Sequence, residues 1–269
     1  MSFLEYEFMQ RALVAAVLVG VAAPAIGTFL VQRRLSLMGD GIGHIALTGV
    51  ALGFLLGTAP VLTAIVVAIL GAVAIELLRE RGRTTGDVAL ALLFYGGIAG
   101  GVLLIGLSPG GSSATLVSYL FGSLSSVRPT DLVVIAGLSV AVIGVVAVFG
   151  RELFAVCSDE EVARVSGLPV RFLNILVAVT AAVTVTVAMR VVGLLLVSAL
   201  MVVPVAAAQQ LSASFRATLV GACAVGMLAS VGGLVVAFYA DVAPGASTVV
   251  LALGGFLVAA LASQLRPVR

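Results

Sequence analysis

Long apolar runs separated by short polar breaks occupy nearly the whole chain. A helix needs about 20 apolar residues to cross the hydrocarbon core of a bilayer, and runs near this length follow one another here. We expect about nine spans, with eight possible, at residues 9–31, 42–57, 60–78, 88–107, 130–149, 172–189, 191–209, 217–238 and 246–264. The pattern predicts an all-α polytopic membrane protein in which residues 1–269 form a single transmembrane domain.

The stretch 114–127 is also apolar, but serines interrupt it and it is short for a crossing. Irregular backbone is tolerated at membrane depth where it packs against protein. We therefore expect a re-entrant half-helix at this position.

The longest polar break runs from Arg151 to Arg171. Ser158 and the acidic residues 159–161 are typical of a helix start, with Ser158 as the side-chain cap, and Gly167 and Pro169 are typical of its end. This pattern predicts a helix of about two turns in a loop. From periodicity alone, a simple connector is an equally good interpretation.

Composition supports the membrane assignment, because 62% of the residues are hydrophobic and only 10% are charged, with a mean hydropathy of +1.29. So few charges cannot cover a soluble domain of this length. The first run is not typical of a cleaved signal peptide, since it is long and preceded by Glu5 and Glu7. We expect a multi-pass protein of the cytoplasmic (inner) membrane.

The arginines predict the orientation, since short cytoplasmic loops carry an excess of positive charge. All 14 positive residues are Arg. If the first span runs inward, three lie outside, namely Arg11, Arg128 and Arg190. Eleven lie on the cytoplasmic side: Arg33, Arg34, Arg79, Arg81, Arg83, Arg151, Arg164, Arg171, Arg216, Arg266 and Arg269.

Several kinds of chemistry are excluded by counting residues. A GxxxxGK[ST] phosphate loop needs Lys, which is absent, and an HExxH zinc protease helix needs two His, whereas only His44 occurs. A GxSxG match at 106–110 has no predicted strand before it and is attributed to chance. We expect no catalytic residue, no stably bound cofactor, no disulfide between Cys157 and Cys223, and no nucleic-acid partner.

Asp40 and His44 are the candidate metal ligands. They are four residues apart, which on a helix places both side chains on one face with Cβ atoms about 5–6 Å apart. An aspartate within a span is costly unless it is paired or faces a water-filled path. An equally weighted interpretation is that Asp40 caps the second span while His44 hydrogen-bonds a neighbouring helix. Gly49, Gly53 and Gly57 continue the same span and predict close helix packing.

Four ordered blocks carry a resemblance to a known family. They are RRLSLMGDGIGH at 33–44, FGSLSSVRPTDL at 121–132, DEEVARVSGLPV at 159–170, and VVGLLLVSALMVVPVAAA at 191–208. Together they resemble the membrane permeases of ATP-binding-cassette importers for zinc, manganese and iron. The resemblance runs in order along nearly the whole chain.

The resemblance implies specific roles and partners. Asp40 and His44 would contact the passing divalent metal, zinc or manganese rather than iron. A cytoplasmic coupling helix would dock on a separate ATPase, through Asp159, Glu160, Glu161, Ala163, Arg164 and Gly167. The permease would pair with a second copy, bind an ATPase dimer and receive metal from an extracytoplasmic binding protein. Gly41 and Gly43 depart from the family pattern, which leaves the choice of metal open.

Two other classes of function are open to test. An ion-coupled secondary carrier would act without an ATPase, but such carriers usually hold acids in several spans, and Asp40 is nearly the only candidate here. A membrane scaffold or enzyme would need a second polar constellation, which the sequence does not suggest.

Overall fold

The structure is a computed structural model of the chain, and it describes residues 6–80, 86–108, 119–122, 129–189 and 192–265. The described part is helical, without strands. Its helices are α1 (Glu7–Gln32), α2 (Met38–Leu55), α3 (Pro60–Glu80), α4 (Gly86–Leu107), α6 (Pro129–Ser158), α7 (Glu160–Val165), α8 (Val170–Ala188), α9 (Leu194–Leu211), α10 (Phe215–Ala240) and α11 (Pro244–Gln264). The predicted all-α class is confirmed.

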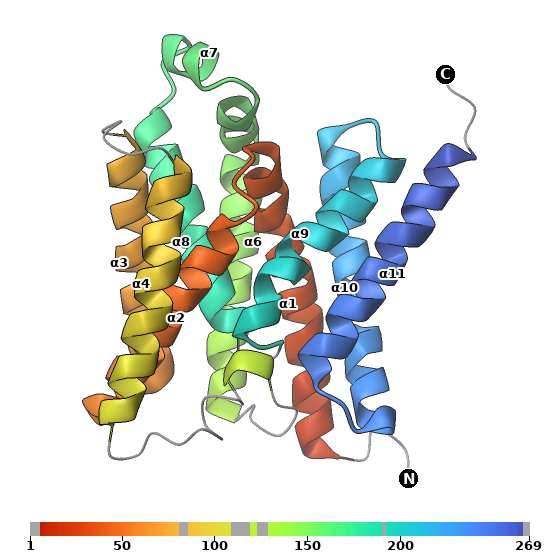
Figure 1. Cartoon of the computed structure of the whole chain (residues 1–269). Helices are drawn as coiled ribbons and strands as arrows, with labels where there is room; N and C mark the ends of the chain where they lie inside the picture. The colour runs from red at the N-terminus through yellow and green to blue at the C-terminus, as the bar shows by residue number, and fades with distance from the viewer. Residues whose placement is uncertain (1–5, 81–85, 109–118, 123–128, 190–191, 266–269) are drawn as a thin grey trace.

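Each of the nine predicted spans corresponds to a helix. Among the described residues, eight helices are long and apolar enough to cross a membrane, and the apolar part of α9, Leu196–Leu211, is shorter. The backbone around Val192 touches Gly245, so the turn before α9 lies against the first turn of α11. Figure 1 shows the N-terminus and the C-terminus at opposite ends of the bundle.

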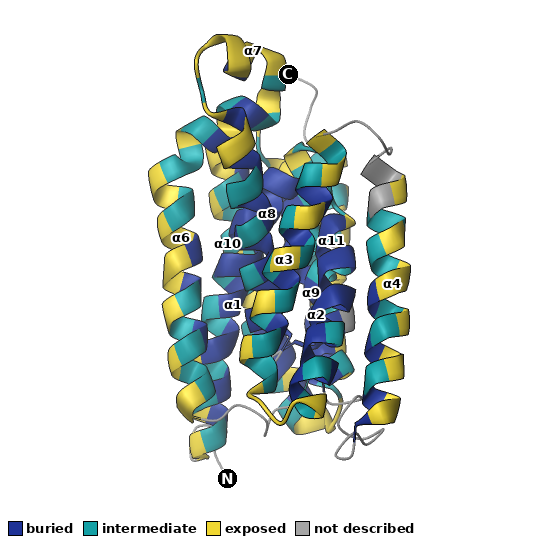
Figure 2. Ribbon diagram, turned by 90° about the vertical axis from the view of Figure 1, so that its left-hand side faces the viewer, coloured by how far each residue is buried: buried dark blue, intermediate teal, exposed yellow. Residues whose placement is uncertain are grey.

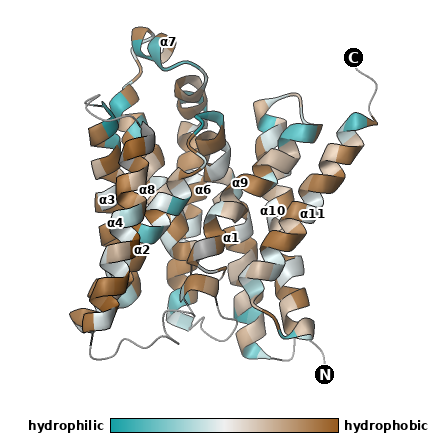
Figure 3. Ribbon diagram, viewed as in Figure 1, coloured by the Kyte–Doolittle hydropathy of each residue, from teal (hydrophilic) through white to brown (hydrophobic). Residues whose placement is uncertain are grey.

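The core of the bundle is built on α1, α2 and α8, which are the most buried spans. Figure 2 shows these helices in dark blue, whereas α4 and α6 have exposed outer faces. Much of the buried face of α1 is alanine, and small side chains allow helix backbones to approach closely in lipid. Figure 3 shows hydrophobic residues along the spans and hydrophilic residues gathered near helix ends and around α7.

Two of the three glycines predicted to pack, Gly49 and Gly53, lie in α2 against α3, whereas Gly57 lies beyond the helix, where an added Cβ would meet no described atom within 4 Å. A Cβ on Gly49 would lie 2.6 Å from the Cα of Ala64, and one on Gly53 would lie 2.7 Å from the Cα of Pro60. Gly57 has a φ of +64° and forms the turn that follows the helix. The close approach of the two helices therefore depends on the missing side chains.

One span is longer than predicted. The sequence pattern ends it at residue 149, but α6 continues to Ser158 as a helix of 30 residues. Leu153 and Val156 in the added part are buried, and the Cys157 thiol lies 3.7 Å from the carbonyl oxygen of Phe29 in α1. Cys157 is therefore on a helix and not in a loop, because packing against α1 extends the helix past the charges at Arg151 and Glu152. Both cysteines are free thiols, as expected.

The re-entrant segment predicted at 114–127 lies mostly outside the described residues. Within the described part, residues 119–121 are helical, and the ring of Tyr119 lies 6.1 Å from that of Phe54 in α2. The prediction of a half-helix therefore stays a prediction.

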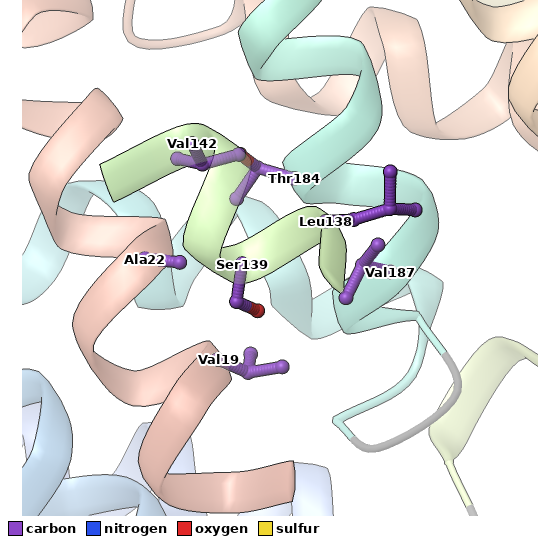
Figure 4. Close-up of a pocket in the computed structure, with 7 residues that line it drawn as sticks. All are labelled: Val19, Ala22, Leu138, Ser139, Val142, Thr184 and Val187. Atoms are coloured by element: carbon purple, nitrogen blue, oxygen red, sulfur yellow. The ribbon is translucent and has the colours of Figure 1, made fainter. Parts of the chain in front are cut away.

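A narrow void lies between α1, α6 and α8, as Figure 4 shows. It does not admit a water molecule, and its lining is mainly aliphatic. The hydroxyl of Ser139 is buried beside it without a hydrogen-bond partner. We interpret the void as imperfect packing, not as a ligand site.

Candidate functional site

Asp40 lies in the first turn of α2 and is held by a helix distant in sequence. Its carboxylate accepts a hydrogen bond of 2.5 Å from the hydroxyl of Ser198 in α9. A Cβ on Gly39 would lie 3.5 Å from the Cβ of Ser198, so Gly39 offers a smooth surface to α9. Leu37 and not Asp40 is the cap residue of α2, and Asp40 lies in the first turn, where a negative charge is favourable, so its role as a helix-end residue stays open.

His44 follows one turn later and is fixed by packing against α4. Its side chain is 7% exposed, and its ring lies edge-on to that of Phe94 with 4.4 Å between the ring centroids. A Cβ on Gly97 would lie 2.6 Å from the carbonyl carbon of His44, so the two backbones are in contact. The hydroxyl of Thr48 donates a 2.7 Å hydrogen bond to the carbonyl of Gly97 and ties the helices together.

The Nδ1 atom of His44 is buried without a hydrogen-bond partner. A buried polar atom that lacks a partner costs free energy, so its position calls for a functional explanation. The alternative in which His44 hydrogen-bonds a neighbouring helix gains no support at this atom.

A cavity of about 360 Å³ opens beside Asp40, between α2 and α4. Asp40 provides the charged side chain of its wall, and aromatic and aliphatic residues provide most of the rest. The lining residues are Leu37, Asp40, Gly41, Leu90, Ala91, Phe94 and Tyr95. His44 is not in the wall, because the ring of Phe94 packs against it. The structure thus places both predicted ligands on α2 but only one of them on the cavity.

The ligand set of α2 is small. Among the described residues, no group of three or more His, Cys, Asp or Glu side chains converges in a way that could hold a metal ion. A structural zinc site needs four protein ligands. One carboxylate and one imidazole are therefore suited to transient contact with a cation, not to tight storage.

Sequence reasoning missed Ser198 and Phe94. Ser198 lies within the block at 191–208 that carried part of the resemblance, so a polar residue within an apolar run was the available signal. Nothing in the spacing of Phe94 distinguishes it from other apolar residues of α4, because its role depends on which helix packs beside α2.

The predicted coupling segment forms α7, and Figure 1 shows it standing beyond the ends of the spans. The predicted cap is wrong by one residue. Asp159 accepts 3.0 Å hydrogen bonds from the backbone N–H groups of Glu161 and Val162, whereas Ser158 is the last residue of α6. The carboxylate reaches the free N–H groups because the chain bends after the extended α6. Gly167, with a φ of +82°, provides the turn after the helix.

The two faces of α7 differ in chemistry. Ala163 is buried, and Glu160 pairs with Arg164 at 3.0 Å and with Arg33 of the α1–α2 connection at 3.7 Å. On the other face Glu161 is exposed, as are two valines, Val162 at 61% and Val165 at 90%. Glu161 and the two valines give this face of α7 a mixed acidic and apolar character.

A second polar region that the sequence analysis did not identify lies beneath α7. Glu76 of α3 is 4% exposed and pairs with Arg79 at 3.1 Å, so Asp40 is not nearly the only acid within a span. Arg171 pairs with Glu80 at 3.1 Å. A cavity of about 370 Å³ lies here, lined by Glu76, Glu80, Glu160, Arg164, Leu168, Val170, Arg171 and Asn174.

The arginines predicted to be cytoplasmic gather at one end where the structure describes them. They belong to the α1–α2 connection, the last turn of α3, the upper part of α6, α7 itself, and the first turns of α8 and α10. Figure 1 shows all of these at the end that carries α7. The shared end agrees with the predicted charge asymmetry, and its cytoplasmic side stays a prediction.

Comparisons with known proteins match this architecture over almost the whole chain. Residues 5–263 match the ABC 3 transport family. The chain is 36% identical over 250 residues to a probable metal transport system membrane protein of Treponema pallidum, covering 93% of each chain. It is 32% identical over 254 residues to the manganese import system permease protein ScaB of Streptococcus gordonii, covering 94% of this chain and 91% of ScaB.

Two further comparisons agree. The chain is 34% identical over 264 residues to the chelated iron transport system membrane protein YfeD of Yersinia pestis, covering 98% of this chain and 88% of YfeD. The solved structure of PsaBC from Streptococcus pneumoniae in complex with Fab superposes with a TM-score of 0.86 at 34% identity, covering 95% of this chain and 91% of that chain. The chain therefore belongs to the ABC 3 transport family and is a multi-pass protein of the cell membrane.

Proposed function

We propose that this chain is the permease subunit of an ATP-binding-cassette importer that moves a divalent transition metal ion across the cytoplasmic membrane. The observation that carries the proposal is the carboxylate of Asp40, which lies on the wall of the cavity between α2 and α4 and is oriented by Ser198. His44 supplies an imidazole one turn away on the same helix. Carboxylate and imidazole are both ligands of zinc, manganese and iron.

The small number of ligands supports transit. An ion must leave a transport site as readily as it enters, so a path is served by weak and incomplete coordination. The exchange of ligands between the cation, Asp40 and His44 would let the metal pass along α2 between two copies of the chain.

The proposal also concerns which metal ion is transported. We favour manganese or zinc over iron as cargo, and two of the relatives carry manganese and chelated iron in their names. The ligand types on α2 do not by themselves separate these metals. Relative uptake rates for the three ions would decide.

The proposed partners follow from the two ends of the molecule. An ATPase dimer would dock at α7, where Glu161, Val162 and Val165 face outward. An extracytoplasmic metal-binding protein would deliver the ion at the opposite end. A second copy of the chain would complete the permease within the bilayer.

Reconstitution tests the proposal. Proteoliposomes holding this chain with its ATPase subunit and its metal-binding protein should accumulate Mn²⁺ or Zn²⁺ only when ATP is supplied to the α7 side. The variant Asp40→Asn, which keeps the shape but removes the charge, should lose uptake. Metal uptake by the permease without the ATPase would instead favour the ion-coupled secondary carrier.

A further inference from the structure

We propose that Arg33 is a positioning residue that transmits movement of α7 to the metal-contacting helix α2. This inference rests on the proposed function, because it assumes that an ATPase acts on α7. It also gives Glu160 a different role from that of its neighbour Glu161, since Glu160 acts inside the permease and not on the ATPase surface.

The contacts of Arg33 join two elements, α1 and α7. Arg33 is the residue that ends α1, and its side chain is 7% exposed. Its Nη2 atom lies 3.7 Å from Oε2 of Glu160, whose other carboxylate oxygen accepts a 3.0 Å hydrogen bond from Arg164. Among the described residues, the Arg33–Glu160 contact is the ion pair that joins α7 to a helix outside its own loop.

The positive charge of Arg33 is buried, and its stability depends on the charges around it. Burial lowers the pKa of Arg33, and the positive charge of Arg79 lowers it further, whereas Cys157, Glu76 and Glu160 act in the opposite direction. A buried cation needs nearby negative charge, and Glu160 is the carboxylate near Arg33 that belongs to α7, so a displacement of Glu160 would remove part of that compensation.

The connection from Arg33 to α2 is short and internally hydrogen-bonded. The N–H of Leu35 donates to the carbonyl of Leu30 at 2.8 Å, and the N–H of Met38 donates to that of Leu35 at 2.9 Å. Arg34, which precedes Leu35 in this turn, has a φ of +58°. Hydrogen bonds join this turn both to α1 before it and to α2 after it, so a displacement of Arg33 would pass through the turn to the first turn of α2, where Asp40 lies.

The cavity of about 370 Å³ beside Glu160 completes the arrangement. It separates part of α7 from α3 and α8, so those helices leave room for α7 to shift. If α7 shifts, the ion pair with Glu160 would keep Arg33 in contact with α7. In this arrangement a push on α7 reaches α2 through Arg33.

A double-mutant cycle on the assembled transporter tests the inference. The variants are Glu160→Gln, Arg33→Gln and the two combined, and the readout is the amount of Mn²⁺ moved per ATP hydrolysed in proteoliposomes. Each single variant should lower this ratio about 10-fold, and the double variant should be no worse than the more impaired single variant. Arg33→Lys, which retains the charge, should recover most of the ratio. A loss of folding alone would not change a ratio of transport to hydrolysis in the molecules that remain assembled.

The ion pair Arg11–Glu7 is the control, since its 2.6 Å contact lies near the start of α1, at the opposite end of that helix from Arg33. The double variant Glu7→Gln and Arg11→Gln should keep the ratio within about twofold. An unchanged ratio in Glu160→Gln, or strictly multiplicative losses in the cycle, would overturn the inference. If Arg33→Gln does not assemble, the half-exposed Glu160→Gln decides alone. Failure of the unaltered transporter to move Mn²⁺ or Zn²⁺ with ATP would instead reject the proposed function.

Discussion

The start of α2 and the start of α7 both place an aspartate in or before a first helical turn, yet the two carboxylates are satisfied in different ways. Asp159 accepts hydrogen bonds from backbone groups two and three residues away. Asp40 accepts its hydrogen bond from Ser198, which is 158 residues away in the sequence. The first interaction is local, and the second exists only because α9 packs against α2.

The difference follows from the surroundings of each helix. Asp159 lies in a loop beyond the spans, where a short polar side chain finds the free N–H groups of its own helix. Asp40 lies in an apolar bundle, where a charge needs a partner or a water-filled path. The carboxylate of Asp40 faces the cavity, and the Nδ1 of His44 has no partner but lies behind Phe94, whereas Asp159 is occupied by its structural role.

The largest expected difference is in thiol labelling at the two ends of the bundle, which tests the orientation in the membrane. In a background that lacks Cys157 and Cys223, Val242→Cys should react with a membrane-impermeant thiol reagent in intact cells, whereas Ser166→Cys next to α7 should not. The asymmetry of arginine near span ends is the reason. The control is labelling of both variants after the cells are opened. The reverse pattern in intact cells would reject the orientation and the ATP-driven mechanism together.

Removal of the imidazole should strongly reduce transport. His44→Ala is expected to lower Mn²⁺ uptake about 100-fold or more, because one of two candidate ligands is lost. Uptake in proteoliposomes and the thermal stability of the purified protein should be measured together. Thr63→Val, which removes a local hydroxyl contact in α3, is the control and should transport normally. An unaltered uptake rate in His44→Ala would remove His44 from the metal path.

Ser198 tests the difference between the two aspartates, because Asp40 depends on this distant hydroxyl whereas Asp159 is bonded by adjacent backbone groups. Ser198→Ala should lower uptake about 10-fold, mainly by raising the KM for the metal, since Asp40 would lose its orientation. Ser247→Ala is a matched control, because the hydroxyl of Ser247 makes a 2.8 Å hydrogen bond to Gly233 between α10 and α11. The control should leave the KM unchanged. Equal effects of both variants on the KM would show that Ser198 has only a packing role.

The contact between α4 and His44 should be sensitive to a single methyl group. Gly97→Ala would place a Cβ within 2.6 Å of the carbonyl carbon of His44 and should destabilise the protein by about 1–3 kcal/mol. Gly96→Ala is the control on the same helix, because a Cβ there meets no atom within 4 Å. Thermal unfolding in detergent compares the two. A Gly97→Ala variant as stable as Gly96→Ala would mean that α4 does not pack on His44 as described.

The smallest effect is expected at the local cap of α7. Asp159→Ala should destabilise α7 by about 1 kcal/mol and weaken co-purification of the ATPase, whereas Asp159→Asn should retain the cap and the association. The pair of variants separates capping from charge. If both variants lose the ATPase equally, the negative charge of Asp159, and not its capping hydrogen bonds, would be needed for docking.

The elements of this protein were largely predictable from local patterns. The lengths of the apolar runs are sufficient to predict the spans, because a bilayer demands a minimum length of apolar helix. Residues 158–161, Gly167 and Pro169 predict the position of α7 with the cap misplaced by one residue, since capping and helix termination depend on adjacent residues. The boundary of α6 could not be predicted, because Leu153 and Val156 extend it only by packing on α1.

The sequence by itself therefore determined the spans, the short helix α7 and the shared face of Asp40 and His44, since each depends on residues within one or two turns. Only the tertiary structure decided that Ser198 holds Asp40, that Phe94 covers His44 and that Arg33 meets Glu160. In a bundle of uniformly apolar helices, hydrophobic periodicity carries little information about which helices become neighbours. The partners of the polar residues are set by that choice of neighbours.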